Sequence, residues 1–184
     1  MAPAPATAAP PADAALIAAW QEGDEQAAAE LVRRHARALA RYLVGAGASE
    51  SDVDDLVQDA FVRAFRSLGR FRGQCRFRTW LFTIGGNLLK DLGRRIARHR
   101  IVPLDEDLRA GADGDPHEVA VAGEAEARLR GGLGELTRMQ REVFLLRAQQ
   151  GLEYGEIAVA LESTEGAARV HYHHAVRRLK EMLE

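Results

Sequence analysis

The sequence predicts an all-α protein made of two small helical domains joined by a flexible acidic linker. Three observations predict this fold class. Alanine, leucine and arginine dominate and only 6% of residues are aromatic, a mix that favours helices over sheets. Apolar residues recur at helical spacing in two separate parts of the chain. Between them, residues 101–127 hold two prolines, several glycines and many acids without a clear period, which is typical of a linker.

Length and composition set the outer limits of the domains. The 184 residues suffice for one domain or two small ones. We expect a disordered tail over residues 1–13, a first domain over 14–100 and a second over 128–184.

No apolar run approaches the ~20 residues of a membrane span, and the tail lacks the basic start of a secretory signal. We therefore expect a cytoplasmic protein with no membrane insertion.

Three helices are expected to open the first domain. The first covers residues 14–20, and the second runs from about Glu25 to Val44, capped by Asp24. Ser49 or Ser51 caps the third, whose buried stripe includes Leu56, Ala60 and Phe61 at helical spacing. Its opposite face carries Asp55, Gln58 and Asp59. These polar residues either are simply solvated, as acids near a helix N-terminus often are, or dock a basic partner protein.

The stretch from Phe71 to Leu81 mixes arginines with Phe and Trp. Cations and rings together suit unpaired nucleic acid, because each stacked base is worth ~1–3 kcal/mol. An ordinary loop whose aromatic residues belong to the core is the alternative. The only cysteine, Cys75, lies here; it is either a tolerated lone thiol or, with a lowered pKa, a redox switch. A single cysteine excludes an internal disulfide framework and a multi-cysteine zinc site.

A further helix is expected from about Thr79, as N-cap, to Arg98. Gly85 and Gly86 interrupt its pattern, at a cost of roughly 2 kcal/mol relative to two alanines. Either the helix bends there or another group approaches its backbone closely.

Charge is segregated along the chain. Residues 63–100 hold ten arginines and one lysine against one acid, a net charge of +10, whereas residues 1–62 carry −6, 101–127 carry −7 and 128–184 carry +1, which sum to −2. One strongly positive block in an otherwise acidic chain is a localised electrostatic footprint for nucleic acid.

The second domain has the pattern of a helix-turn-helix. A capping box at Thr137 starts a helix to Gln150. A short helix over 154–161, a turn over 162–164 and a long helix over 165–182 follow. The start of the second helix of such a motif faces base edges in the major groove. Its outward residues are Arg169, Val170, His171, His173 and His174.

Three ordered motifs resemble the extracytoplasmic-function (ECF) group of bacterial sigma-70 factors. The first is Asp55-Leu56-Val57-Gln58-Asp59-Ala60-Phe61. The second is Phe77-Arg78-Thr79-Trp80-Leu81 followed by Ile84, Asn87, Asp91, Arg94 and Arg95. The third is the run from Gln140 to Arg147 with Gly151-Leu152, Glu156-Ile157-Ala158, Leu161 and Glu165-Gly166. The two domains thereby resemble sigma region 2 and the helix-turn-helix region 4.

The resemblance implies a transcription initiation factor that binds core RNA polymerase and recognises and melts promoters. Asp55, Gln58 and Asp59 would bind the β′ clamp, and the implied polymerase partner also includes its β flap. The −10 element would be bound by Phe71, Arg72, Arg76, Arg78, Phe82, Asn87, Lys90, Arg94 and Arg95. The −35 element would be bound by Arg169, Val170, His171, His173 and His174. An anti-sigma factor is implied as a partner, and no catalytic residue is implied.

Two departures from the family pattern stand out. Gly85-Gly86 replaces an alanine and a larger residue, which bears on how a base is captured. Three histidines cluster in the recognition helix, but no nearby carboxylate or cysteine completes a metal set. We expect a pH-sensitive DNA contact there rather than a metal, and no cofactor.

Other classes of protein fit less of the sequence. A stand-alone helix-turn-helix regulator with a helical sensor domain would bind its operator without polymerase. A helical adaptor that binds only proteins would leave the positive block without a role. An enzyme is disfavoured because no phosphate-binding loop, metal-ligand set or nucleophile elbow is present.

Overall fold

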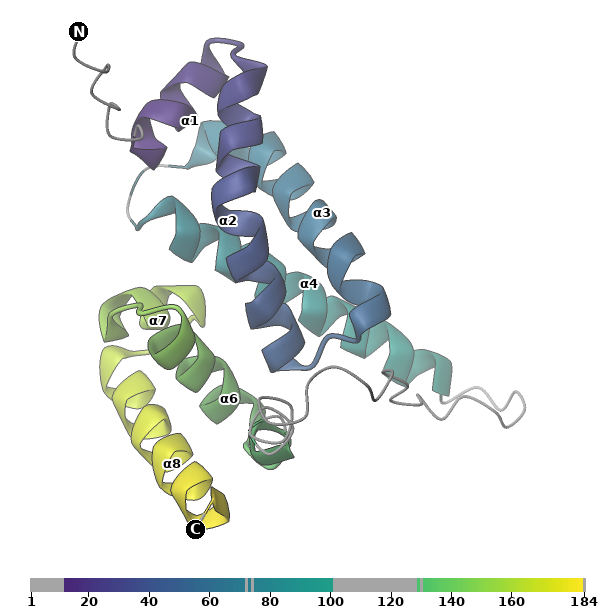
Figure 1. The fold of residues 1–184 in the computed structure, drawn as a ribbon, viewed down its shortest axis with the longest axis vertical. Helices are drawn as coiled ribbons and strands as arrows, with labels where there is room; N and C mark the ends of the chain where they lie inside the picture. The colour runs from purple at the N-terminus through teal and green to yellow at the C-terminus, as the bar shows by residue number, and fades with distance from the viewer. Residues whose placement is uncertain (1–11, 72, 74, 101–128, 130, 184) are drawn as a thin grey trace, which may run out of the picture.

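The computed structural model describes residues 12–71, 73, 75–100, 129 and 131–183, and all regular elements within these ranges are helical (Figure 1). The predicted all-α fold class is confirmed. The predicted linker and residues 1–11 of the predicted tail lie outside the described residues. Asp13, which was assigned to the tail, is instead the first residue of a helix.

The first domain is a bundle of four α-helices. They are α1 (Asp13–Gln21), α2 (Glu25–Ala46), α3 (Glu50–Ser67) and α4 (Phe77–Arg100), with a 3₁₀ turn η1 (Leu68–Arg70) after α3. Helix α2 packs against the other three, and α3 also packs against α4. The fully buried side chains between them are mostly leucines: Leu31, Leu39, Leu43, Leu81 and Leu88.

Local sequence signals set the ends of α2 and α3. The Asp24 carboxylate accepts a hydrogen bond of 2.9 Å from the Gln26 backbone N–H, and Ser49 Oγ accepts one of 3.2 Å from Asp52. Gly47 ends α2 with φ +111°, a left-handed conformation that glycine adopts without steric cost. Each side-chain cap stabilises its helix by about 1 kcal/mol. The predicted cap at Asp24 is therefore confirmed, and of the two serines that could cap α3, Ser49 is the one that does.

Helix α4 begins two residues earlier than predicted. It starts at Phe77, so the expectation that Thr79 is its N-cap is wrong. Thr79 is only 1% exposed, and its hydroxyl donates a 3.3 Å hydrogen bond to Glu156 of the second domain. A partner 77 residues away, rather than the local backbone, therefore satisfies this side chain.

The glycine pair in α4 allows α2 to approach closely. A Cβ added at Gly85 would lie 2.8 Å from Leu39 Cδ1, and one at Gly86 would lie 3.1 Å from Tyr42 Oη. Of the two explanations that the sequence left open, close approach of another group is therefore observed. The helix-propensity cost of the two glycines is offset by tight packing of α4 on α2.

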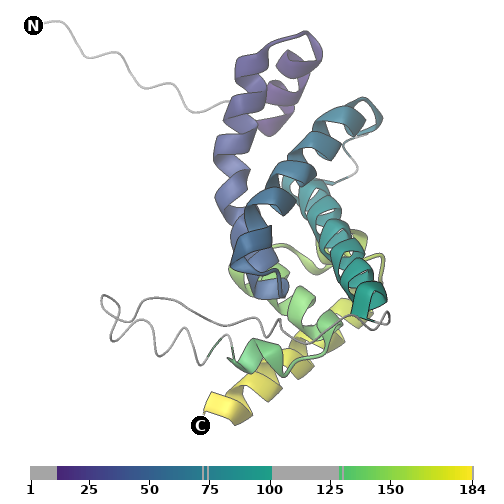
Figure 2. The same ribbon diagram turned by 90° about the vertical axis from the view of Figure 1, so that its right-hand side faces the viewer.

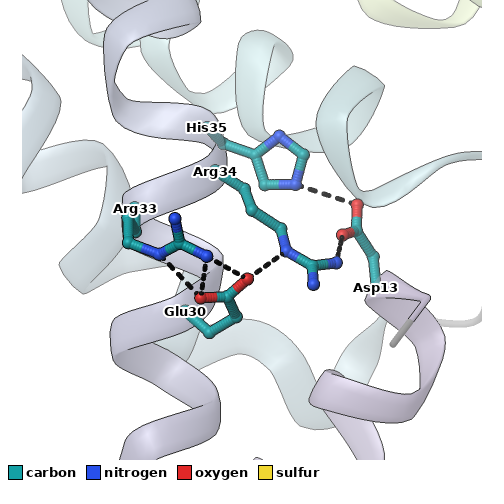
Figure 3. A network of polar contacts seen from close by, with 5 residues as sticks. All are labelled: Asp13, Glu30, Arg33, Arg34 and His35. Carbon is teal, nitrogen blue, oxygen red and sulfur yellow. Dashed lines mark hydrogen bonds and ion pairs between the residues drawn. The ribbon is translucent and has the colours of Figure 1, made fainter. Parts of the chain in front are cut away.

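Helix α1 is attached to α2 by a polar cluster (Figure 3). Asp13 Oδ2 lies 2.8 Å from His35 Nε2, and Asp13 Oδ1 lies 3.4 Å from Arg34 Nη1. Glu30 accepts hydrogen bonds from both Arg33 and Arg34. The His35 ring also lies 5.5 Å from the Phe77 ring at the start of α4. His35 thus has a packing role between α1, α2 and the start of α4.

In the described part of the second domain, a helical segment at residues 131–134 precedes three further helices and a π-helical turn. Helix α6 (Arg138–Phe144) continues into the π turn η2 (Leu145–Gln149), and α7 (Tyr154–Ala160) and α8 (Glu165–Leu183) follow. The predicted capping box is present, with Thr137 and Gln140 bonded reciprocally. The second domain lies at the end of the bundle away from α1, as both views show (Figures 1 and 2).

Candidate polymerase- and DNA-binding surfaces

The acidic face of α3 is open to solvent. Leu56, Ala60 and Phe61 are buried on the bundle side, whereas Asp55, Gln58 and Asp59 are exposed. Helical periodicity alone separates the two faces, as predicted. Within the described residues no ion pair is formed by Asp55 or Asp59. Their charge is therefore available to a partner.

The aromatic residues around the loop after α3 form one cluster. The ring of Phe71 lies 4.9 Å from Trp80 and 6.3 Å from Phe77. Phe77 is 3% exposed and so belongs to the core, while Phe71 is half-buried. Trp80 is half-buried as well, so Phe71 and Trp80 both keep part of a ring accessible, whereas Phe77 packs against them from the core side.

Phe82 does not line the surface in this conformation. It is 1% exposed and stacks on Tyr42 at 5.3 Å with an interplanar angle of 30°. The Arg78 guanidinium also lies over the Phe82 ring, 5.4 Å from its centroid. The expectation that Phe82 contacts a −10 base therefore needs correction: the close approach of α4 to α2 draws this ring into the core.

The cations of the positive block differ in what they contact. Arg76 and Arg95 are exposed, Lys90 is half-buried with Nζ 3.4 Å from Asn87 Oδ1, and Arg94 donates to Asp91 at 2.6 Å. Arg78 donates to Gln150 of the second domain, and burial lowers the pKa of its guanidinium. Arg72 lies outside the described residues.

Sequence reasoning missed Gln150 and Glu156. Gln150 accepts a hydrogen bond from Arg78 and Glu156 pairs with Arg76, two residues of the predicted −10 surface that lie more than 70 residues away in the chain. Gln150 is 5% exposed. Helical periodicity and capping patterns report only on neighbours in sequence, so no local signal could have found these two residues.

The thiol of Cys75 is not activated. Burial raises its pKa, and the nearby Glu156 carboxylate raises it further, against a smaller lowering by the Trp80 backbone. A raised pKa reduces the thiolate fraction and hence reactivity. The redox alternative, which required a lowered pKa, is therefore contradicted.

The helix-turn-helix presents the start of α8 outward. Ala168, Ala175 and Leu179 are buried against the domain, as predicted. Val170 is 53% exposed, and Arg169, His173 and His174 are exposed while His171 is half-buried. The five predicted −35 residues thus share the first turns of α8. Among the described residues, no group of three or more His, Cys, Asp or Glu side chains could hold a metal ion.

Two arginines lie against the ring of Tyr154 at the start of α7. Arg147 donates to the Leu152 carbonyl at 2.8 Å, and its guanidinium lies 4.9 Å from the Tyr154 ring. Arg169 lies 5.1 Å from the same ring and donates to Glu165 at 2.6 Å. Cation–ring contacts of this kind contribute ~0.5–1 kcal/mol at exposed sites. They hold Arg169 in place on the outer face of α8.

Comparison with known proteins agrees with this geometry. Residues 31–99 match sigma-70 region 2, and residues 127–179 match sigma-70 region 4. The chain is 36% identical over 180 residues to the RNA polymerase sigma factor NccH of Alcaligenes xylosoxydans xylosoxydans, covering 95% of this chain and 96% of the relative. It is 32% identical over 185 residues to the ECF RNA polymerase sigma-E factor of Haemophilus influenzae, covering 94% and 93%.

A solved structure is similar over almost the whole chain. It is that of CnrH in complex with the cytosolic domain of CnrY, with a TM-score of 0.72 and 33% identity, covering 94% of this chain and 97% of that one. The sigma factor RpoE of Bartonella quintana, in complex with the anti-sigma factor NepR, shares the fold with a TM-score of 0.67. That likeness covers 84% of this chain and 94% of the other, at 21% identity.

Two helical domains, an open acidic face on one and a helix-turn-helix in the other define a promoter-recognising transcription initiation factor. The chain belongs to the ECF group of the sigma-70 family of RNA polymerase sigma factors. Because the chain belongs to this family, the alternative of a stand-alone helix-turn-helix regulator is not favoured. Among the described helices, none is both long enough and apolar enough to span a membrane.

Proposed function

We propose that this chain docks on core RNA polymerase through Asp55, Gln58 and Asp59 and then opens promoter DNA with the positive block of the first domain. The observation that carries the proposal is that the two faces of α3 differ. One face is buried in the bundle, and the other exposes two carboxylates with no ion-pair partner among the described residues. Such a face favours a basic partner by electrostatic complementarity.

We infer two further contacts on this basis. Phe71 receives an unpaired −10 base, while arginines and Lys90 hold the phosphates of the melted strand, because rings and cations together bind single strands. The exposed start of α8 binds the −35 duplex in the major groove. Polymerase carries out the chemistry, so the chain itself is not an enzyme, and its place of action is the cytoplasm.

We infer that an anti-sigma protein holds this chain inactive. Two structurally similar sigma factors were solved in complex with a CnrY domain and with the anti-sigma factor NepR. A partner that covers the acidic face of α3 or the positive block would block polymerase or DNA.

Core-polymerase affinity tests the docking assignment. We expect Asp59→Arg to weaken binding of purified core by about tenfold or more, because it places like charges at the interface. Glu22→Arg is the matched control: it makes the same charge change at an exposed position at the end of α1. Equal affinity of the two variants for core would contradict the assignment.

A further inference from the structure

A cavity of about 580 Å³ lies between the two domains, where the end of α2, the second half of α4 and the start of α6 meet. Residues of all three helices contribute to its wall, and none of the described lining residues belongs to the acidic face of α3 or to the outward face of α8. A volume of this size suits a small molecule.

One buried carboxylate oxygen in the cavity wall has no partner. Glu142, a lining residue, is 5% exposed, and its Oε1 accepts a 3.2 Å hydrogen bond from Arg138 Nη1. Its Oε2 is buried and accepts no hydrogen bond from any described residue. A buried acceptor without a donor destabilises a protein, and a ligand N–H that reaches Oε2 would relieve this. The cavity is therefore suited to a ligand that carries a hydrogen-bond donor.

Four cations surround this carboxylate. Lys90 and Arg94 of α4 and Arg138 and Arg141 of α6 line the cavity with Glu142, and four positive charges against one negative charge give a net charge of +3. Arg141 is fixed by hydrogen bonds of 2.6 and 3.0 Å to backbone carbonyls before α6. The side chains of Arg94 and Arg138 are 71% and 57% exposed, which places them at the mouth of the cavity. Guanidinium and ammonium groups in this number favour phosphate groups.

The rest of the wall is apolar and open. Leu89 and Ala97 of α4 and Ala46 of α2 line it, and a Cβ added at Gly93 would meet no atom within 4 Å. Uncharged space between a buried acceptor and exposed cations suits an aromatic ring that joins a donor edge to a charged tail.

We propose that this cavity binds a nucleotide, with the N–H edge of the base at Glu142 Oε2 and the phosphates at Lys90 and Arg94. Guanine fits this arrangement best, because its ring N–H and its amino group lie side by side on one edge, whereas uracil presents a single N–H between two carbonyl oxygens. The proposal depends on the cavity and not on the proposed function. Because Lys90 and Arg94 are also expected at the −10 strand, a bound nucleotide would cover part of that surface.

Two substitutions test the polar ends of the site. Glu142→Gln removes the charge of the buried acceptor and keeps its size, and Glu135→Gln makes the same change at an exposed position before α6, outside this cavity. Arg94→Gln removes a cation from the mouth of the cavity, and Arg98→Gln removes one from an exposed position about one turn further along α4.

A third substitution tests the space between them. Gly93→Leu places a side chain in the cavity without displacing a neighbour, since nothing lies within 4 Å of the added Cβ. Gly166→Leu is the matched control, because it changes an exposed glycine of α8 whose added Cβ also meets nothing within 4 Å. Leucine favours a helix more than glycine does, so both variants should fold, and circular dichroism checks the helix content of every variant.

Isothermal titration calorimetry of the full chain in magnesium-free buffer measures the affinities for GTP, UTP and pyrophosphate. We expect GTP to bind at least about tenfold more tightly than UTP or pyrophosphate, the usual effect of a hydrogen bond to a charged group. Glu142→Gln should remove this preference without lowering the affinity for pyrophosphate. Arg94→Gln should weaken GTP and pyrophosphate alike, and Gly93→Leu should weaken GTP. The three control variants should match the parent chain.

No binding of GTP at millimolar concentration, or equal affinities for GTP and pyrophosphate, would overturn the proposal. Equal GTP affinities of Gly93→Leu and Gly166→Leu would also overturn it, because the ligand would then lie outside the cavity. These measurements contain neither polymerase nor DNA, so their outcome is independent of the proposed function.

Discussion

Asp13 Oδ2 lies 2.8 Å from His35 Nε2 and thereby joins α1 to α2 across 22 residues of chain (Figure 3). His35 is largely buried, with 12% of its side chain exposed, and its ring also packs near Phe77. His35 therefore links the first helix of the chain to the start of α4, beside the proposed DNA surface.

Loss of this contact should loosen α1 without unfolding the bundle. We expect His35→Ala to lower the free energy of α1 opening by about 1 kcal/mol or more, the usual net worth of a hydrogen bond. Hydrogen exchange of the α1 amides measures it. Glu22→Gln, at the exposed end of α1, should change little. Equal protection of α1 in wild type and His35→Ala would refute a holding role for the pair.

Position 85 of α4, a glycine, should not tolerate a side chain. We expect Gly85→Val to destabilise the protein by about 1–3 kcal/mol, because a Cβ there meets the buried Leu39 at 2.8 Å and overpacking costs that much. Gly93→Val makes the same change in the same helix with nothing within 4 Å of the added Cβ. Thermal unfolding of the two variants gives the difference. Equal unfolding temperatures of the two variants would show that Leu39 of α2 does not restrict the side chain at position 85.

The Cys75 thiol should react slowly at neutral pH. Because burial and Glu156 raise its pKa, the reactive thiolate is scarce at pH 7 and becomes abundant only above the usual thiol range. Alkylation by iodoacetamide, followed by mass spectrometry across pH 6–10, measures this. Glu156→Gln should speed the reaction and Glu135→Gln should not. A rate at pH 7 equal to that of an unfolded chain would contradict the raised pKa.

Arg169 should carry −35 selectivity. Its side chain is 64% exposed and is held by Glu165 and Tyr154 on the outer face of α8. We expect Arg169→Ala to cost about 1–3 kcal/mol of binding to a preferred −35 duplex, while core affinity stays unchanged. Lys180→Ala removes an exposed charge near the end of the same helix and should spare selectivity. Uniform weakening over all duplexes in a competition assay would instead assign Arg169 to the phosphates.

The sequence predicted features that depend on near neighbours. The caps at Asp24, Ser49 and Thr137 each bond a backbone group two or three residues away, so a short pattern was enough to find them. The buried and exposed faces of α3 follow equally from one period. Gly85 and Gly86 signalled either a bend or a close approach, and only the position of Leu39 and Tyr42 decided between the two.

Features that depend on distant partners could not be predicted. Thr79 was expected to cap α4, but its hydroxyl bonds Glu156. Phe82 was expected at the DNA surface, but Tyr42 draws it into the core. The π turn at Leu145–Gln149 has no local signature, although it brings Leu145 to Gly45 and Gln150 to Arg78. Each of these outcomes is set by how one helix or domain lies on another.

Run-off transcription of fragmented genomic DNA from the source organism, with purified core polymerase, tests the central claim most directly. The 5′ ends of transcripts are mapped by sequencing with and without the added protein. We expect new 5′ ends at a limited set of sites only when the protein is present, and their loss with Asp59→Arg but not with Glu22→Arg. Identical 5′ ends with and without the wild-type protein would contradict its role in promoter-directed initiation.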